Sequence, residues 1–250
     1  MKKMLFLLGG HDLEMLTIRT LLEKEQIPYK DHALFWHNAC LSSYRQDMVE
    51  AEATHCTIWG VELMEDIPPV ANYHRIDHHN NLAHLPSALE QVASILSVPM
   101  GRYFQLVSAN DRAYIPGMEQ LGATSEEIAS IRWADRAAQG ITLEEEQMAE
   151  EAVNQHAALI NDLWVVQARS PRFSPICDRM YPYVRLLVYT DTEWVYYGQH
   201  ASRVATLFNR EYRIHKLYAG GGENGYVGTI QGMYTPFELR IMVNQIINLQ

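Results

Sequence analysis

The feature that most constrains the fold is an alternation, in the first half of the chain, between short apolar runs and segments with apolar residues at helical spacing. The strand-like runs occupy residues 4–8, 56–61, 73–76 and 103–107. The helix-like segments occupy residues 16–25, 86–96 and 125–136. Strands that alternate with helices are typical of a parallel sheet covered by helices. We therefore predict an α/β domain over this half of the chain.

The pattern changes in the second half. Residues 143–163 are predicted to form one long helix, which opens with Thr142 and Glu145 at the spacing of a capping box. Residues 185–190 and 193–197 predict a β-hairpin, and residues 202–209 and 236–247 predict helices on either side of a glycine-rich loop. We expect a larger α/β domain, 1–142, a helical connector, 143–163, and a smaller C-terminal α+β domain, 164–250.

Charge and apolar content argue against several classes of protein. With 20 Lys and Arg against 30 Asp and Glu, the formal net charge is -10, whereas binding along duplex DNA depends on neutralising many phosphates. No run approaches the roughly 18 apolar residues of a membrane span. The apolar run at the start is shorter than the roughly 7–15 residues of a signal-peptide core. We therefore expect a cytoplasmic protein that binds neither duplex DNA nor a membrane.

Acidic residues and histidines directly follow each predicted strand. They are His11, Asp12 and Glu14 after the first strand, Glu62 after the second, Asp77, His78 and His79 after the third, and Asp111 after the fourth. Open parallel sheets present ligand sites at the carboxyl ends of their strands. Converging carboxylates would repel one another without a cation, and imidazole shifts the preference toward manganese, iron, cobalt or zinc. Two such ions about 3.5–4 Å apart could activate a water and hold phosphoryl oxygens, which favours phosphoester hydrolysis.

At these positions the sequence resembles the DHH phosphoesterase superfamily. Asp77-His78-His79 matches the signature triplet, Asp12-x-Glu14 is similar to the first motif, and Glu62 and Asp111 stand where the second-motif and fourth-motif aspartates are expected. The segment 220–225 is similar to the GGGH segment of the DHHA1 domain that commonly follows. The resemblance covers most of the chain. It implies a DHH-like metal-binding catalytic domain, a DHHA1-like substrate-binding domain, and substrate held between them.

The resemblance also implies roles for individual residues. Two Mn²⁺ ions, or other divalent cations, would be held by the metal ligands His11, Asp12, Glu14, Glu62, His79 and Asp111. Asp77, His78 and His79 would act in catalysis. The far end of the substrate would bind Arg203 and the loop of Gly220, Gly221, Gly222, Glu223, Asn224 and Gly225. The expected substrate is a short single-stranded oligonucleotide, a cyclic dinucleotide or another small nucleotide-like phosphate, and a homodimer is left open.

Some positions depart from the family pattern. Leu8 stands where the family commonly has a histidine ligand, for which His11 could substitute. Glu14 and Glu62 replace aspartates, and Glu223 stands where the family has histidine. These departures favour an alternative function: a catalytically weak or inactive DHH-fold protein that serves as a nucleotide-binding or regulatory module.

Several of these residues also have purely structural explanations. Asp12 can cap the helix that follows it. Glu62 can be a solvated strand end, and Asp111 can pair with Arg112. Residues 194–197 can either stack a base or belong to the core of the smaller domain.

Overall fold

The computed structural model describes residues 3–249, and the chain divides into two compact units between Gly140 and Ile141. Each unit has its own sheet and its own buried core. No helix among residues 3–249 is both long enough and apolar enough to cross a membrane.

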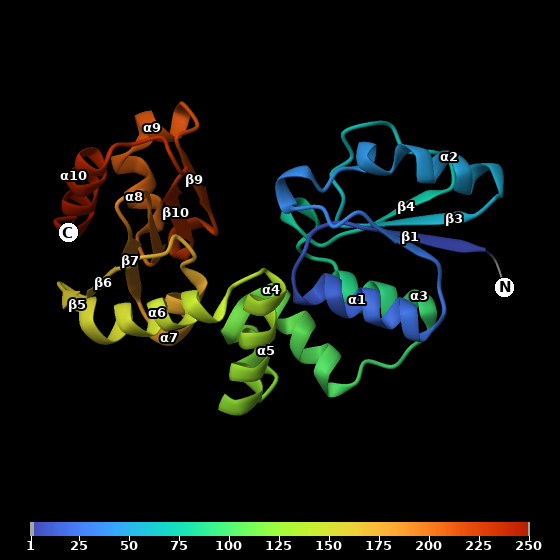
Figure 1. The fold of residues 1–250 in the computed structure, drawn as a ribbon, viewed down its shortest axis with the longest axis horizontal. Coiled ribbons are helices and arrows are strands. Elements are labelled where there is room, and N and C mark those ends of the chain that lie inside the picture. Colours follow the sequence, from blue (N-terminus) through green and yellow to red (C-terminus); the bar gives the residue numbers. More distant parts are fainter. Residues whose placement is uncertain (1–2, 250) are drawn as a thin grey trace. The chain divides into compact units, whose positions relative to one another are not determined.

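The first unit is built on a four-stranded sheet in the order β2-β1-β3-β4, in which every neighbouring pair is parallel. Its strands are β1 (Met4–Leu8), β2 (Tyr29–Asp31), β3 (Thr57–Val61) and β4 (Tyr73–Ile76). Figure 1 shows α2 (Arg45–Ala53) on one face of this sheet, and α1 (Leu13–Lys24) and α3 (Ala88–Leu96) on the other. Three short 3-10 helices complete it: η1 (Trp36–Asn38), η2 (Leu41–Tyr44) and η3 (Asn80–Leu82). The predicted α/β fold with a parallel sheet is confirmed.

Alternation along β1 divides its side chains between two cores. Leu5 and Leu7 belong to the cluster that includes residues of α2, whereas Phe6 and Leu8 point to the opposite face and are fully buried. The buried Tyr44 hydroxyl donates a hydrogen bond to the Leu8 carbonyl oxygen at 2.5 Å. The carboxyl end of β1 is therefore packed on both of its faces. The first acidic residues of the candidate site come directly after it.

Helix α4 (Arg102–Gln120) overturns one sequence-based prediction, because residues 103–107 belong to this helix and form no fourth strand. The aromatic and apolar residues of that run suggested a buried strand, but buried Leu106 and Asn110 recur four residues apart, as on one face of a helix. Asp111 therefore extends from a helix and does not follow a strand. The next helix, α5 (Ser125–Ala138), confirms the predicted one and has a capping box at Thr124.

Helix α4 is broken near its middle. Ala113 and Tyr114 have non-helical backbone angles, and the φ of Tyr114 is 56°. Pro116 accounts for the break, because it lacks an N–H and its ring crowds the carbonyl oxygen four residues earlier. Gly117 completes the bend: a Cβ there would lie 2.6 Å from the Ala109 carbonyl oxygen. The break begins two residues after Asp111.

The second unit contains a six-stranded mixed sheet in the order β5-β6-β7-β8-β10-β9. Its strands are β5 (Ala157–Ile160), β6 (Leu163–Gln167), β7 (Arg185–Tyr189), β8 (Trp194–Gly198), β9 (Leu217–Gly220) and β10 (Tyr226–Thr229). Its helices are α6 (Leu143–His156), α7 (Ser174–Met180), α8 (Ala201–Leu207), α9 (Asn209–Arg213), η4 (Gly222–Asn224) and α10 (Pro236–Ile247). The β7–β8 hairpin, α8 and α10 match the predicted smaller α+β domain.

The segment 143–163 is not one continuous helix. Helix α6 ends at His156, and β5 then pairs with β6 across a two-residue turn of Asn161 and Asp162. Both turn residues have positive φ, 48° and 63°, which is the type I′ geometry that Asn and Asp tolerate. Helix α6 contributes Ala149 and Ala152 to a core cluster of the second unit. It is therefore packed into that unit instead of forming a free connector.

The aromatic run 194–197 lies mostly in the core of the second unit. Trp194 has no exposed surface, Val195 and Tyr196 are buried, and Tyr197 is partly buried. The Trp194 ring packs against Phe208 with centroids 5.6 Å apart. The core explanation is confirmed for Trp194, Val195 and Tyr196, and they offer no surface for stacking a base.

Candidate metal centre

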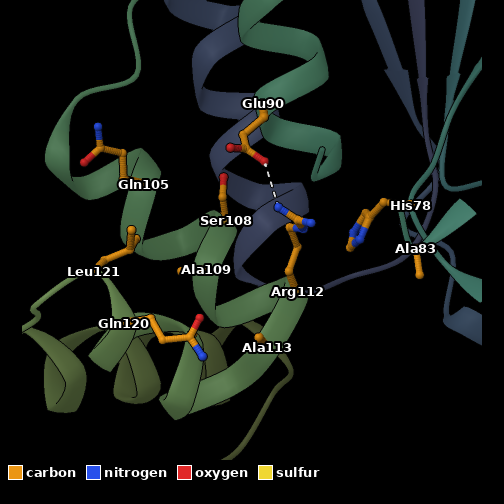
Figure 2. A pocket seen from close by; sticks show the side chains of 11 residues that line it. His78, Ala83, Glu90, Gln105, Ser108, Ala109, Arg112, Ala113, Gln120 and Leu121 are labelled. Atoms are coloured by element: carbon orange, nitrogen blue, oxygen red, sulfur yellow. Dashed lines mark ion pairs between the residues drawn. The ribbon is translucent and has the colours of Figure 1, made fainter. Parts of the chain in front are cut away.

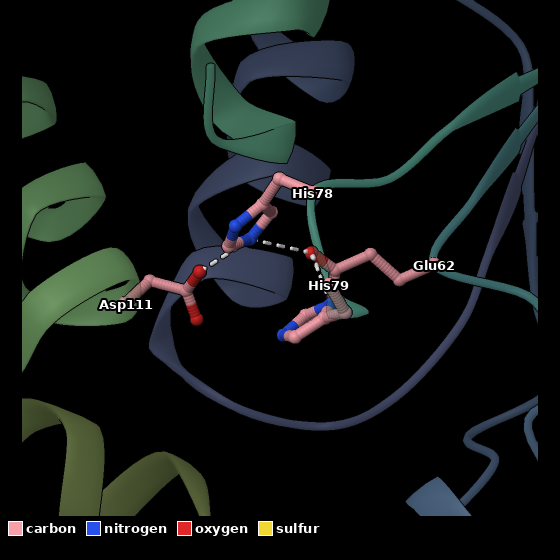
Figure 3. Close-up of side chains that lie close together, drawn as sticks. All are labelled: Glu62, His78, His79 and Asp111. Atoms are coloured by element: carbon pink, nitrogen blue, oxygen red, sulfur yellow. Dashed lines mark ion pairs between the residues drawn. The ribbon is translucent and has the colours of Figure 1, made fainter. Parts of the chain in front are cut away.

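Four acidic and histidine side chains from three parts of the first unit lie close together, as Figure 3 shows for Glu62, His78, His79 and Asp111. Glu62 follows β3, the two histidines follow β4, and Asp111 lies on α4. One ligand atom from each lies within 4.8 Å of the others. Residues far apart in the sequence therefore converge at the carboxyl ends of neighbouring parallel strands.

The imidazole of His78 is at the middle of this cluster. Its Nε2 lies 2.6 Å from Asp111 Oδ2, 3.2 Å from Glu62 Oε1 and 3.6 Å from Glu14 Oε2. The side chains of Glu14, Glu62 and His78 are between 1% and 5% exposed, and that of Asp111 is 14% exposed. The sequence predicts a ligand role for His79 and not for His78, but two adjacent residues after the same strand cannot be told apart by position alone.

The backbone of Glu62 is held in an unusual conformation. Its φ is 52°, in the left-handed region that side chains other than glycine and asparagine seldom adopt. Its N–H donates to the Ile76 carbonyl oxygen at 2.8 Å, which ties the ends of β3 and β4 together. Glu62 is 6% exposed, so the solvated strand end that the sequence allowed is excluded. Such strain persists where the surrounding structure imposes it, often at functional sites.

Several buried atoms of the cluster make no well-aligned hydrogen bond, although three of the carboxylates lie within ion-pair distance of His78. Among residues 3–249 they include both side-chain oxygens of Glu62, one oxygen each of Glu14 and Asp111, and Nε2 of His78. The other oxygen of Glu14 accepts from the Leu89 N–H at 3.0 Å. Buried carboxylate oxygens without partners are costly unless a cation neutralises them. This donor set of carboxylates and imidazole fits a divalent metal ion.

The protonation of these groups reflects the same crowding. Burial raises the pKa of Glu62 well above its ordinary value, and burial also raises that of Asp111. Burial opposes a charge on His78, but the surrounding carboxylates outweigh it and raise its pKa to about 12. In the metal-free protein a protonated imidazole therefore supplies the positive charge that the carboxylates require.

Asp12 has a structural role beside the cluster. Its Oδ1 accepts a hydrogen bond from the Met15 N–H at 2.9 Å, which confirms that it caps α1. Burial, and then the charge of Asp111, raise the pKa of Asp12 to about 7. Its carboxylate lines the same cavity as Glu62 and His79. Capping therefore coexists with a position next to the candidate metal site.

Asp77 holds the His79 ring in place. Its Oδ1 lies 3.1 Å from His79 Nδ1 and accepts from the His79 N–H at 2.8 Å. The Arg75 side chain donates to the other oxygen, with Nε at 3.1 Å. Burial opposes ionisation of Asp77, but these hydrogen bonds and the Arg75 charge outweigh it and lower its pKa. A carboxylate that fixes the orientation of an imidazole is the arrangement seen around metal-ligating histidines.

Other predicted site residues stand apart from the cluster. His11 is half-buried but is not one of the four grouped ligand residues. Arg112 lies 3.9 Å from Glu90, while Asp111 contacts His78, so the structure does not show the simple Asp111–Arg112 ion pair. The glycine-rich loop and Arg203 belong to the second unit.

The glycine-rich loop joins β9 to β10. Gly221 and Gly222 have φ values of 72° and 66°, which glycine adopts without strain. A Cβ on Gly225 would collide with the Gly220 carbonyl oxygen, so the loop closes tightly on itself. Arg203 is exposed on α8. The side chain of Glu223 lies outside the described residues.

Two cavities in the first unit border the cluster. One, of about 760 Å³, is lined by Asp12, Trp36, Glu62, Asp77 and His79, among others. The second, of about 580 Å³, lies beside His78 and the broken helix α4. Figure 2 shows Arg112 extending between Glu90 and His78 in this second cavity. Trp36, Arg75 and Arg112 were not predicted from the sequence, because none is part of a recognised motif.

Without metal, the protein should become less stable as the pH rises from about 5 to 8. The folded-state pKa of Asp12 is about 7 against an ordinary 3.8, so its contribution is present at low pH and is lost as pH rises through 7. The raised pKa values of Glu62, Asp111 and His78 act in the same direction.

Scanning calorimetry of the chelated protein would show this as a falling melting temperature. Asp12→Asn keeps a capping oxygen but removes the titrating group, and it should flatten the dependence. A melting temperature that stays level or rises over this range in the unsubstituted protein would contradict the prediction.

Comparisons with known proteins give structural matches only. No protein-family model matches the chain, and no curated protein sequence matches it. A DHH domain described as a member of the s1p family of ribosomal proteins shares 14% identity over 99% of this chain and 87% of its own, with a TM-score of 0.58. The pGpG-specific phosphodiesterase PggH from Vibrio cholerae shares 13% identity over 99% of this chain and 98% of its own, with a TM-score of 0.47.

A third match is to RecJ from Thermus thermophilus, solved in complex with Mn²⁺, at 11% identity and a TM-score of 0.45. It covers 98% of this chain and 52% of that chain, so this protein spans about half the length of that RecJ. The first of the three likenesses, to the DHH domain, is close enough to show a shared fold.

Proposed function

On the DHH fold that this chain adopts, we propose that it is a metal-dependent phosphoesterase that hydrolyses small nucleotide-like phosphates. One observation carries the proposal: three carboxylates crowd around one buried imidazole at the carboxyl end of the parallel sheet, and a single imidazole N–H cannot satisfy all of their oxygens. Fold alone does not imply an activity, whereas this donor set points to a specific chemistry.

We assign the metal ligands from the cluster itself. The carboxylates of Glu14, Glu62 and Asp111 surround Nε2 of His78, and Asp12 and His79 line the larger cavity beside them. Two Mn²⁺ ions suit these six donors, and other divalent cations are compatible with them. His78, expected from the sequence to act in catalysis, is thereby assigned as a metal ligand, and we assign no ligand role to His11. The ions would supply a water activated as nucleophile and positive charge for the phosphoryl oxygens.

The protein's own residues would then position the substrate. Asp77 and Arg75 hold the His79 ring in a fixed orientation at the wall of the larger cavity. Arg112, in the second cavity, offers a cation that lies 3.9 Å from the carboxylate of Glu90. A planar guanidinium in such a position suits a phosphate oxygen. The substrates we propose are therefore a short single-stranded oligonucleotide, a cyclic dinucleotide or a related nucleotide ester.

The second unit would seat the far end of the substrate. Backbone N–H groups of the loop from Gly220 to Gly225 can approach an anion, because glycines leave room for it. Arg203, exposed on α8, would add a positive charge. We propose these as substrate-binding residues, with Glu223 and Asn224 belonging to the same loop.

A binding or regulatory module is the alternative function. Leu8, fully buried at the end of β1, cannot supply the ligand that histidine would supply there. This version predicts weak or single-site metal uptake. Isothermal titration with Mn²⁺ separates the two, because two tightly bound ions per chain would count against the binding-only version.

Hydrolysis of a panel of short nucleotides tests the enzyme directly. We expect turnover with Mn²⁺, its loss on chelation, and its recovery when metal is restored. Asp77→Ala should lower kcat about 10–100-fold, because removing the partner that orients a metal-ligating histidine has effects of that size. Asp47→Ala, which removes a carboxylate on α2 that pairs with Lys30 and His32, is the matched control. Turnover that survives chelation, or that Asp77→Ala leaves undiminished, would reject the assignment.

A further inference from the structure

Trp36 is an exposed aromatic residue at the wall of the larger cavity. It begins the 3-10 helix η1 and is 48% exposed, although tryptophan is usually well buried. The same cavity contains Glu62, Asp77 and His79. An indole beside carboxylates and imidazoles adds nothing to metal binding, so its position calls for another explanation.

The indole is held in place by its neighbours. A Cβ on Gly10 would lie 2.3 Å from three atoms of the six-membered ring of Trp36, so only glycine allows this contact. The Trp36 ring also meets the His79 ring edge-on, with centroids 6.3 Å apart. Two residues of the candidate site region therefore fix the indole, while nearly half of its surface remains open.

The spacing suits a nucleotide. The centroid of the His79 ring lies 4.4 Å from that of the His78 ring and 6.3 Å from that of the indole. Trp36 therefore contacts one candidate ligand residue, His79, and is a single ring away from His78 at the middle of the cluster. In a nucleotide, the base is likewise separated from the phosphate by one sugar ring.

We propose that Trp36 stacks on the nucleobase of the substrate and so makes the enzyme select nucleotide esters over simple phosphate esters. This inference rests on the proposed function. Base stacking on an aromatic side chain tolerates any base, because every base presents a π-face, and it contributes about 1–3 kcal/mol per base. Trp36 would therefore select for the presence of a base and would not distinguish one base from another.

Two chromogenic diesters test this with the same leaving group. Thymidine 5′-(p-nitrophenyl) phosphate carries a base, and methyl p-nitrophenyl phosphate does not. Trp36→Ala should raise KM for the thymidine ester about 10-fold with little change in kcat. The preference for the thymidine ester over the methyl ester, as a ratio of kcat/KM, should fall by the same factor. Trp36→Phe should retain most of that preference, because phenylalanine still offers a ring.

Trp133→Ala is the matched control, since Trp133 is 46% exposed and lies on α5. It should leave the preference between the two esters as it is. If Trp36→Ala instead lowered kcat/KM for both esters by the same factor, Trp36 would only hold the site in shape, and the proposal would be overturned. The same conclusion would follow if Trp36→Phe lowered both values equally.

A binding measurement keeps the two proposals distinguishable. Thymidine monophosphate with Mg²⁺ should quench part of the intrinsic tryptophan fluorescence, and Trp36→Phe should remove that part. If neither diester is hydrolysed but this quenching occurs, the proposed function fails while the stacking role stands. If both diesters are hydrolysed and the quenching is absent or persists in Trp36→Phe, the stacking role fails alone.

Discussion

Replacing His78 with alanine should lower kcat for phosphoester hydrolysis by at least about 1,000-fold. The Nε2 atom of His78 lies within 3.6 Å of carboxylate oxygens from Glu14, Glu62 and Asp111, so no other side chain can replace it as a ligand. A metal ion contributes several kcal/mol of transition-state stabilisation, and each 1.4 kcal/mol is a factor of ten in rate. Initial rates at saturating Mn²⁺ would measure the loss.

The same substitution should also destabilise the metal-free protein. Without the imidazole, three buried carboxylates lose their counter-charge, and breaking a buried ion pair in this way costs about 3–5 kcal/mol. Adding Mn²⁺ should restore part of that stability, which calorimetry of chelated and metal-loaded protein would detect. His74→Ala is the control, because His74 lies four residues earlier and is exposed on β4. It should change neither kcat nor the stability of the metal-free protein greatly. Retention of a tenth or more of the activity in His78→Ala would rule out the ligand role.

Replacing Gly9 with alanine should lower kcat/KM about 100-fold without removing any functional group. A Cβ on Gly9 would lie 2.5 Å from the carbonyl oxygens of both Val61 and Glu62. These are backbone atoms at the end of β3 and cannot rotate away, so β1 and β3 must separate where Glu62 joins the cluster. A displacement of about 1 Å at a catalytic site can cost a hundredfold in rate, and overpacking costs about 1–3 kcal/mol of stability.

Manganese titration and chemical denaturation would separate the two effects of this substitution. Gly9→Ala should weaken metal binding as well as stability, because it shifts a ligand. Gly101→Ala is the control, since no atom lies within 4 Å of the Cβ that it would add. If Gly9→Ala binds Mn²⁺ and turns over substrate as the unsubstituted protein does, the position of Glu62 does not depend on this close approach.

The sheet and most of the candidate site could be predicted from the sequence. Three of the four strands, β1, β3 and β4, were predicted, whereas the three-residue edge strand β2 was not. The carboxyl ends of parallel strands share one edge of a sheet. Residues such as Asp12, Glu62 and His78 follow those strands directly, so their convergence follows from strand order alone. Glu14 is brought in by the first turn of α1, which Asp12 begins. Their metal-binding roles remain predictions.

The parts that could not be predicted depend on contacts between distant residues. Residues 103–107 have strand-like composition, yet tertiary packing places them in a helix. The left-handed backbone of Glu62 has no signal in its own residue type, because it is imposed by the junction of β3 and β4. Asn161 and Asp162 did carry a turn signal, but the apolar residues around them fitted a continued helix equally well.

The second cavity and the position of Trp36 could not be predicted, because the residues that form them belong to no recognised sequence motif. Arg112 acquires its position from the bend in α4, and Trp36 from its contact with Gly10. Such relations depend on three-dimensional proximity. A single sequence records the residues but not the distances between them.

The break in α4 gives the candidate centre a mechanical link to the second cavity. Asp111 lies in the last turn before the break, while Ala113 and Gly117, on either side of Pro116, line the cavity beside Arg112. The Arg132 guanidinium, 4.6 Å from the Tyr114 ring, braces the bend from α5. A ligand in this cavity that changed the bend would therefore shift the Asp111 carboxylate relative to His78.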